Sequence, residues 1–246
     1  MAVRIAFDEV DSTQSAALDR ARAGAVDGTY VVSATQSSGA GRSGRTWASP
    51  RGGLYLSWIG RLPRAAPSLL PLAVGVELRR ELVGGAGTET QLKWPNDLYV
   101  VVPGRPPQKL GGILVDEVHV GPNASRAIVG VGLNVTTPRS SLPPELQSTA
   151  AILAELATPI PNVRATESWV VDAIERSVDR LETPGGPAAV VAECRQHLYG
   201  VGAPVSVDGR PVGILRDLAD DGAAAVEQDG AVVTIHAGEL THPELA

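Results

Sequence analysis

The stretch Gln36–Trp47 constrains the chain most, because it puts three glycines and two arginines into a short connection between two strand-like segments. The glycines allow the backbone to turn sharply and to approach a ligand closely, while Arg42 and Arg45 supply guanidinium groups that bind anions. Residues 29–34 and 54–59 are apolar and rich in strand-forming residues, so we expect the loop to be held at both ends by strands.

The glycines of this loop also read G-x-G-x-x-G, the pattern of a dinucleotide-binding turn. That turn needs a helix opening inside it and an acidic residue about 20 positions later. Residues 48–53 contain Pro50, Gly52 and Gly53 and cannot start a helix, and residues 59–65 hold no carboxylate. We therefore expect an anion-binding loop outside a dinucleotide fold, with a solvated surface loop as the alternative.

Composition limits the class of protein. The chain has 246 residues, 43% hydrophobic and 20% charged, which suits one large domain or a large and a small one in a soluble, cytoplasmic protein. Asp8 and Glu9 oppose a signal peptide, and Cys194 has no second cysteine to pair with. The net charge of −6 argues against nonspecific nucleic-acid binding, so anion binding must be local.

The order of periodic segments predicts an α+β chain. A strand followed by Asp11-Ser12 gives an N-cap for an alanine-rich helix. The expected strands are residues 3–7, 29–34, 54–59, 90–94, 98–102, 111–118 and 126–135, and the expected helices are residues 13–23, 68–83, 148–156, 163–181 and 187–199. In the fourth of these helices, Trp169, Ile174, Val178 and Leu181 share one face that we expect to be buried.

After residue 203 the pattern changes to short strands separated by Asp-Gly pairs. Residues 205–207, 212–215, 223–227 and 232–236 alternate with Asp208-Gly209, Asp221-Gly222 and Asp229-Gly230, which are strong hairpin signals. The last forty-odd residues are therefore predicted to form a small β-barrel.

Lysine is rare in this chain: of 21 basic residues only Lys93 and Lys109 are lysines. Either the two lysines have been retained by chance in a chain that favours arginine, or their positions require a compact ammonium group. Lys93 opens the motif Lys-Trp-Pro-Asn-Asp and Lys109 precedes a Gly-Gly pair, while Gly130–Asn134 brings a further amide to a strand end. Each motif alone is explained by a turn or a bulge, but together they suit a site that holds several negative charges.

Five motifs in this order resemble the biotin protein ligases, the enzymes that attach biotin to carboxylases. The resemblance covers nearly the whole chain and rests on Asp11–Thr13, Gln36–Trp47, Lys93–Asp97, Lys109–Leu114 and Gly130–Asn134. It implies a mixed sheet flanked by helices, of the class II aminoacyl-tRNA synthetase and biotin ligase kind, followed by an SH3-like β-barrel. The implied domains are a catalytic one over residues 1–200 and the barrel over residues 201–246.

The resemblance also implies the chemistry: biotin and Mg-ATP give biotinyl-5′-AMP, and the biotinyl group then passes to a lysine of a carboxylase biotin carrier domain. Lys109 and Arg42 are the implied catalytic residues, and Asp97 either contacts Mg²⁺ or caps its turn. Trp94 either lines the pocket or packs in the core. The implied biotin-binding residues are Ser12, Thr13, Gln14, Gln36, Gly39, Ala40, Gly41, Arg42, Lys109 and Gly112, and the implied ATP-binding residues are Arg45, Trp47, Lys93, Asn96, Asp97 and Asn134.

The chain departs from the family pattern at two positions. Ala40 stands where an arginine is usual in the glycine loop, and Gln14 replaces an asparagine after Ser-Thr. Regulatory members of the family carry an N-terminal helix-turn-helix, but the motifs here begin at residue 11, so we expect no DNA partner and no membrane partner. A lipoate or octanoate ligase is the alternative within this architecture, and a noncatalytic binding module is the alternative outside it.

Overall fold

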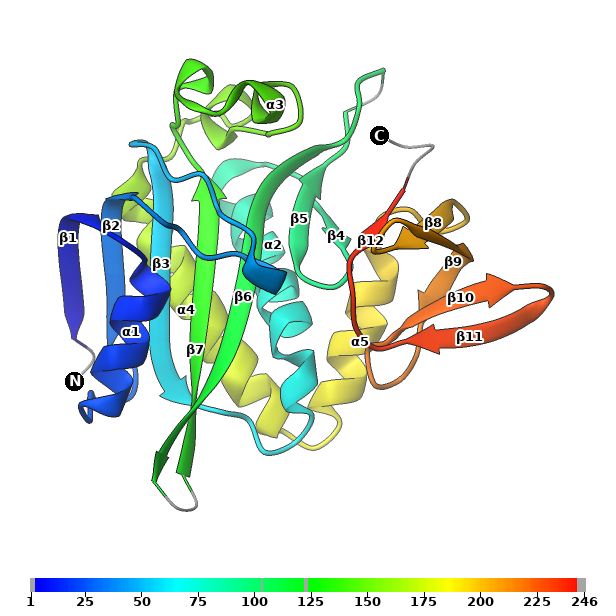
Figure 1. Cartoon of the computed structure of the whole chain (residues 1–246), viewed down its shortest axis with the longest axis horizontal. Coiled ribbons are helices and arrows are strands. Elements are labelled where there is room, and N and C mark those ends of the chain that lie inside the picture. The colour runs from blue at the N-terminus through cyan, green and yellow to red at the C-terminus, as the bar shows by residue number, and fades with distance from the viewer. Residues whose placement is uncertain (1–2, 103, 122–123, 243–246) are drawn as a thin grey trace.

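Two β-sheets organise the chain in the computed structural model, which describes residues 3–102, 104–121 and 124–242 (Figure 1). The larger sheet has seven strands in the order β1-β2-β3-β7-β6-β5-β4; β1 and β2 are parallel and the other neighbours are antiparallel. Its strands are β1 Arg4–Val10, β2 Tyr30–Gln36, β3 Gly53–Arg61, β4 Gln91–Lys93, β5 Asp97–Val100, β6 Gln108–Gly121 and β7 Ala124–Asn134. The seven predicted strands and the mixed α+β class are thus confirmed.

Helices cover both faces of this sheet. On one face lies α1 (Thr13–Arg22), whose Ala17 and Ala21 pack against Ile59 and Ile128. The other face carries α2 (Leu70–Ala86), α4 (Val163–Glu182) and α5 (Gly186–Gln196), which form the main core with it (Figure 1). The predicted apolar face of α4 is confirmed: Ile174, Val178 and Leu181 are fully buried, and Trp169 is partly buried against the same core.

The predicted N-cap of α1 is also confirmed. Ser12 has an extended backbone, and its hydroxyl accepts hydrogen bonds from the backbone N–H groups of Gln14 and Ser15, at 3.2 and 3.5 Å. The cap fixes the first turn of α1 at the end of β1. That position is where the functional site begins.

The predicted helix over residues 148–156 is wrong. A short helix, α3 (Pro144–Gln147), precedes this segment, and only a single 3-10 turn, Leu153–Glu155, lies within it. The backbone here pairs with β6 instead: Lys109 N–H donates to the carbonyl of Thr149 at 2.8 Å, and Ala151 N–H donates to the carbonyl of Lys109 at 2.9 Å. Tertiary pairing therefore takes the backbone groups that a helix needs.

The last part of the chain forms a five-stranded antiparallel sheet in the order β11-β10-β9-β8-β12. Two-residue hairpin turns of this kind require positive φ at both residues. The φ angles are 48° and 79° in Asp208-Gly209, and 51° and 80° in Asp229-Gly230. The predicted hairpins are confirmed, whereas closure of this sheet into a barrel stays a prediction. The strands are β8 Pro204–Val207, β9 Arg210–Leu218, β10 Ala224–Gln228, β11 Ala231–Ile235 and β12 Leu240–Thr241.

This second sheet is docked on the first unit through Trp94. The Trp94 indole is buried, and its Nε1 donates to the Gly222 carbonyl at 2.9 Å, in the connection between β9 and β10. Leu69 and Leu72 pack against the same glycine, which has no room for a side chain. Of the two roles expected for Trp94, packing in the core is therefore the one observed. None of the helices in the described ranges is long and apolar enough to cross a membrane.

A buried carboxylate joins three arginines where α2, α4 and α5 meet. Glu77 is 3% exposed and accepts hydrogen bonds from Arg80, Arg176 and Arg180 at 3.0, 3.1 and 3.0 Å. Glu77→Ala should lower the free energy of unfolding by about 2 kcal/mol, below the usual loss for a fully buried pair, because two of the arginines stay about half exposed to water. Urea unfolding measures the change.

The matched control is Asp179→Ala, which removes an exposed carboxylate paired with Arg61 at 2.5 Å. It should cost less than about 1 kcal/mol. Equal losses for the two variants would contradict the stabilising role of the Glu77 cluster.

Candidate functional site

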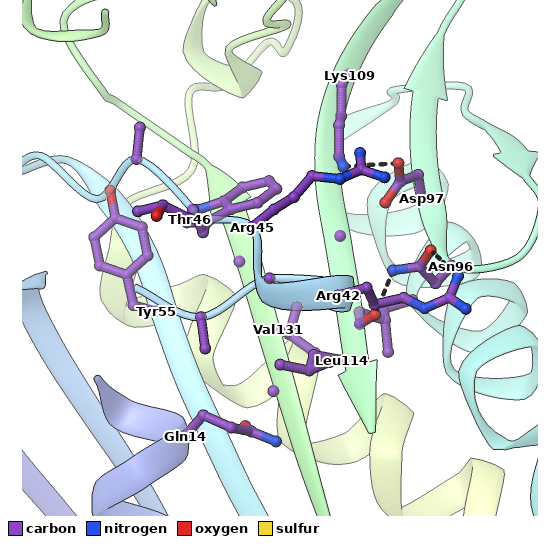
Figure 2. A pocket seen from close by; sticks show the side chains of 18 of the residues that line it. Gln14, Arg42, Arg45, Thr46, Tyr55, Asn96, Asp97, Lys109, Leu114 and Val131 are labelled. Atoms are coloured by element: carbon purple, nitrogen blue, oxygen red, sulfur yellow. Dashed lines mark hydrogen bonds and ion pairs between the residues drawn. The ribbon is translucent and has the colours of Figure 1, made fainter. Parts of the chain in front are cut away.

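A cavity of about 360 Å³ opens between the larger sheet, the loop 36–47 and the segment after β7 (Figure 2). Its walls come from the start of α1, from strands β3, β5, β6 and β7, and from Glu239 before β12. Most residues predicted for a site line this one cavity: Ser12, Thr13, Gln14, Gln36, Ala40, Gly41, Arg42, Arg45, Trp47, Asn96, Asp97, Lys109, Gly112 and Asn134. Four of the five sequence motifs supply most of them, and the fifth contributes Asn134.

Neutral hydrogen-bonding groups form the end of the cavity nearest α1. The Gln36 carboxamide oxygen accepts from the Thr13 backbone N–H at 2.7 Å and from the Thr13 hydroxyl at 3.0 Å. Because the backbone group can only donate, the Gln36 oxygen must face Thr13 and its Nε2 must face Ser49 Oγ, 2.8 Å away. The orientation of this carboxamide is thereby fixed.

The glycine loop is folded as a small hairpin. Gly41 N–H donates to the Arg45 carbonyl and Trp47 N–H to the Gly39 carbonyl, both at 2.8 Å, and Ala40 pairs with Thr46. Gly39 lies outside the cavity lining, but a β-carbon there would be 2.5 Å from the Trp47 carbonyl oxygen. It therefore shapes the hairpin through its small size.

Cationic side chains gather at the other end of the cavity, and adjacent residues of one motif hold two of them. Arg42 donates to the Asn96 side-chain oxygen at 3.2 Å, and Lys109 Nζ lies 2.7 Å from Asp97 Oδ2 (Figure 2). Asn96 is itself tied to β6, since its Nδ2 donates to the Ile113 carbonyl at 2.7 Å. The Asn96-Asp97 turn therefore sets the spacing between both cations.

The third cation, Arg45, pairs with Glu239, more than 190 positions later in the sequence. The hydrogen bond from Arg45 lowers the pKa of the Glu239 carboxyl below its usual value. Sequence reasoning missed Glu239, and also missed Ser57, Leu142 and Leu146 of the lining. No motif marked these residues, because each reaches the cavity through tertiary packing.

Trp47 covers the strands beneath the cationic end. A β-carbon on Gly132 would lie 2.6 Å from its indole and one on Gly112 would lie 3.2 Å away, so these glycines leave room for the ring. Lys109 Nζ lies 5.2 Å from the centre of the same ring, within cation–π range. The indole Nε1 is buried without a hydrogen-bond partner among the described residues.

Lys93 lies outside the cavity lining. Its Nζ is 3.4 Å from the Tyr99 hydroxyl and 5.0 Å from the centre of that ring, and Tyr99 stacks on Tyr199. Burial lowers the pKa of the Lys93 ammonium, and the nearby Asp97 carboxylate partly offsets the effect. Lys93 can therefore act on the cavity through its charge and through Asp97, but not by lining the cavity wall.

The arrangement suits one kind of ligand: a molecule with a neutral polar group at one end and negative charge at the other. Two carboxylates, Asp97 and Glu239, line the cationic end. The described part of the chain has no cluster of three or more His, Cys, Asp or Glu residues placed to hold a metal ion. A divalent cation here would therefore need ligand oxygens as well as protein oxygens.

Comparison with known proteins agrees with this geometry. Residues 6–134 match the biotin/lipoate A/B protein ligase family. The chain is 30% identical to the biotin–[acetyl-CoA-carboxylase] ligase of Mycobacterium tuberculosis, over 95% of this chain and 86% of that protein. It is 28% identical to the bifunctional ligase/repressor BirA of Escherichia coli, over 94% of this chain and 71% of that protein.

The fold is also that of a solved ligase. The structure of a biotin protein ligase from Aquifex aeolicus in complex with biotin and ATP superimposes with a TM-score of 0.80 at 25% identity, covering 97% of both chains. The likeness therefore includes both sheets of this chain.

The contact between Arg45 and Glu239 should restrain the glycine loop. In Glu239→Ala, amide hydrogen exchange over residues 39–47 should become about two- to fivefold faster, as expected for loss of a partly exposed ion pair. Glu227→Ala is the control, because it removes the partner of Arg216 in the same sheet, 2.7 Å away, without touching the loop. If the rate of amide hydrogen exchange in the loop is unchanged in Glu239→Ala, the hydrogen bonds within the hairpin are sufficient to hold it.

Proposed function

Because the chain belongs to the biotin/lipoate A/B protein ligase family, we propose that its cavity activates biotin with ATP and transfers the biotinyl group to a protein lysine. The observation that carries the proposal is the division of one cavity into a neutral hydrogen-bonding end and a cationic end. Biotin has a ureido ring at one end and a carboxylate at the other, and the two ends of the cavity match these groups.

The first step joins two anions, which is the main obstacle. A carboxylate oxygen of biotin bonds to the α-phosphorus of ATP, the bond from that phosphorus to the bridging oxygen breaks, and pyrophosphate leaves. Two like charges 4 Å apart repel by about 4 kcal/mol at an effective dielectric near 20, so cations must lie between them. Lys109 and Arg42, held by Asp97 and Asn96, are the residues we assign to this task.

In the second step the neutral amine of an acceptor lysine attacks the acyl carbon of biotinyl-5′-AMP. The bond between that carbon and the phosphate oxygen breaks, AMP leaves, and the amine loses its surplus proton to solvent. The glycine loop and Trp47 lie over the reacting centre in this assignment and limit the access of water. Arg42 remains beside the phosphate and retains the intermediate until the acceptor arrives.

The remaining site residues divide between the two substrates. We assign the biotin side to Ser12, Thr13, Gln14, Gln36, Ala40, Gly41 and Gly112, with Gly39 acting through the hairpin. Arg45, Trp47, Asn96, Asp97 and Asn134 form the ATP side, and Lys93 contributes its charge from behind Asp97. Loss of the usual arginine at Ala40 leaves three cations, Arg42, Arg45 and Lys109, on the cavity wall.

Magnesium fits this donor set as an ion held mainly by ATP. Mg²⁺ keeps several waters and takes one or two carboxylates together with substrate phosphates, and Asp97 and Glu239 are the two carboxylates of the lining. Asp97 is the proposed ligand, with the Lys109 ammonium beside it. When bound, the ion neutralises phosphate charge.

The proposed acceptor is the biotin carrier domain of a carboxylase, and the proposed location is the cytoplasm. The C-terminal sheet is proposed to be an SH3-like domain over residues 201–246, following a catalytic domain over residues 1–200. The two units nevertheless share the site, since Glu239 lines the cavity. The absence of DNA and membrane partners stays a prediction.

A lipoate or octanoate ligase is the alternative within the family. Its substrates have no ring amide, so the buried polar groups of Thr13 and Gln14 and the half-buried Gln36 carboxamide would face an apolar ligand end at a cost in free energy. Two of the three relatives named above are described as biotin ligases, which also favours biotin. A noncatalytic module would leave the paired cations at one end of the cavity without a role.

Pyrophosphate exchange tests the proposal directly. The purified chain with Mg-ATP should catalyse exchange of labelled pyrophosphate into ATP when biotin is present and not when lipoate or octanoate replaces it. Lipoate-dependent exchange would assign the chain to the alternative ligase, and no exchange with any of the three acids would indicate a noncatalytic module.

Lys109→Met should slow adenylation at least about a hundredfold, because it removes a fixed cation between two anions, worth roughly 3 kcal/mol or more. Single-turnover formation of biotinyl-5′-AMP measures the step. Arg61→Met, which removes an exposed cation from β3, serves as the control and should keep the normal rate. A folded Lys109→Met with near-normal adenylation would remove Lys109 from the mechanism.

Arg42→Ala should weaken biotin binding and let the intermediate escape, because Arg42 is assigned to hold first the carboxylate and then the phosphate. Mass spectrometry should find biotin on lysines of an added bystander protein such as albumin, above the level for the wild-type chain. If neither affinity nor bystander labelling changes, Arg42 is a solvated loop arginine.

A further inference from the structure

The Gln14 carboxamide lies at the inner end of the cavity, away from Lys109 and Asp97 (Figure 2). It is 4% exposed, and its Nε2 donates to Asp116 Oδ2 at 2.8 Å and to the Ile128 carbonyl at 3.1 Å. A carboxylate oxygen and a backbone carbonyl both accept, so both amide protons are used. The Gln14 side chain is therefore held with its nitrogen toward β6 and β7.

The Gln14 oxygen consequently points to the cavity side. A β-carbon on Gly130 would lie 2.5 Å from this oxygen, and Gly130 itself lines the cavity. The Ser57 hydroxyl, 2.9 Å from it, has one proton and is equally close to the Thr13 hydroxyl oxygen. At least one lone pair of the Gln14 oxygen therefore remains available to a ligand N–H.

The Gln36 carboxamide is fixed in the opposite orientation to that of Gln14, because its oxygen is the group held by the protein. Thr13 holds its oxygen, and one proton of its Nε2 goes to Ser49 Oγ. The second Nε2 proton has no acceptor among the described residues, so Gln36 offers a donor to the cavity. The inner end thus presents an acceptor from Gln14 and a donor from Gln36, which complements a ring that carries both N–H and C=O.

From this network we propose that Asp116 is a positioning residue that determines ligand specificity: it orients the Gln14 carboxamide so that its oxygen receives an N–H group of the substrate ring. The inference rests on the proposed function for the identity of that ring, the ureido ring of biotin. Without Asp116 the amide nitrogen keeps only the Ile128 carbonyl as an acceptor among the described residues, and the Ser57 hydroxyl can donate to Thr13 instead of the Gln14 oxygen. The nitrogen can then turn toward the ligand, where two N–H groups oppose each other. A dithiolane ring, which has no N–H, gains nothing from this orientation.

The test measures biotin affinity by calorimetry without ATP for Asp116→Ala, Gln14→Met and the double variant. Each single variant should weaken biotin binding about tenfold, as loss of one buried hydrogen bond implies. The double variant should be no weaker than Gln14→Met alone, because Asp116 acts through Gln14. For Asp116→Ala, turnover at saturating biotin and the KM for ATP should stay within about twofold of the wild type, so that only the KM for biotin rises.

Two further variants keep the test decisive. Glu117→Ala, which removes the exposed neighbour of Asp116 on β6, should leave biotin affinity unchanged. Gly130→Ala displaces the same carboxamide oxygen from the cavity side and should weaken biotin binding without changing the KM for ATP. It tests the position of the Gln14 oxygen with Asp116 still present. If Asp116→Ala does not fold, Asp116→Leu, which keeps a side chain of similar length but cannot accept a hydrogen bond, replaces it in the affinity measurement.

The outcomes separate this inference from the proposed function. If the wild-type chain does not bind biotin, the proposed function fails. If the wild type binds biotin and Asp116→Ala binds it equally well, or if the losses of the two single variants add in the double variant, Asp116 does not act through Gln14 and the inference is overturned.

Discussion

The ion pair between Lys109 and Asp97 is the contact on which the site depends. Cations collected in one cavity repel each other, and each needs a fixed neighbour of opposite charge or dipole to stay there without a ligand. Asp97 pairs with Lys109, and the Asn96 side-chain oxygen accepts from Arg42, so two adjacent residues where β5 begins hold both cations. Arg45 takes its counter-charge from Glu239, in the connection between β11 and β12 of the C-terminal sheet. The C-terminal unit thereby supplies one of the negative charges that balance the cations of the cavity.

The two ends of the cavity differ in chemical character because different parts of the fold build them. The capped first turn of α1 and the end of β2 supply neutral groups whose hydrogen bonds fix their orientation. The Asn96-Asp97 turn, β6 and the glycine loop supply charges. Small residues let these parts meet: Gly112 and Gly132 accept the Trp47 ring, and a larger residue at either position would push that ring away from the strands.

Local patterns predicted much of this structure, and long-range contacts account for what they missed. The Ser12 cap and the Asp-Gly hairpins are encoded by neighbouring residues and were predicted correctly. The segment 148–156 has helical periodicity, yet its backbone pairs with Lys109, some forty residues earlier. Glu239 reaches Arg45 only because the second sheet docks on the first. Neither contact leaves a local sequence signal, which is why the predicted site contained the cations but not all of their partners.

The central claim is that one cavity holds the neutral ring and the reacting anions of biotin and ATP at opposite ends. A crystal structure of the chain with a nonhydrolysable sulfamoyl analogue of biotinyl-5′-AMP tests it most directly. The account predicts the ureido ring against Gln14 and Gln36, and the sulfamoyl group, which replaces the phosphate, within hydrogen-bond distance of Lys109 and Arg42. A reversed analogue, or one bound outside this cavity, would contradict the account.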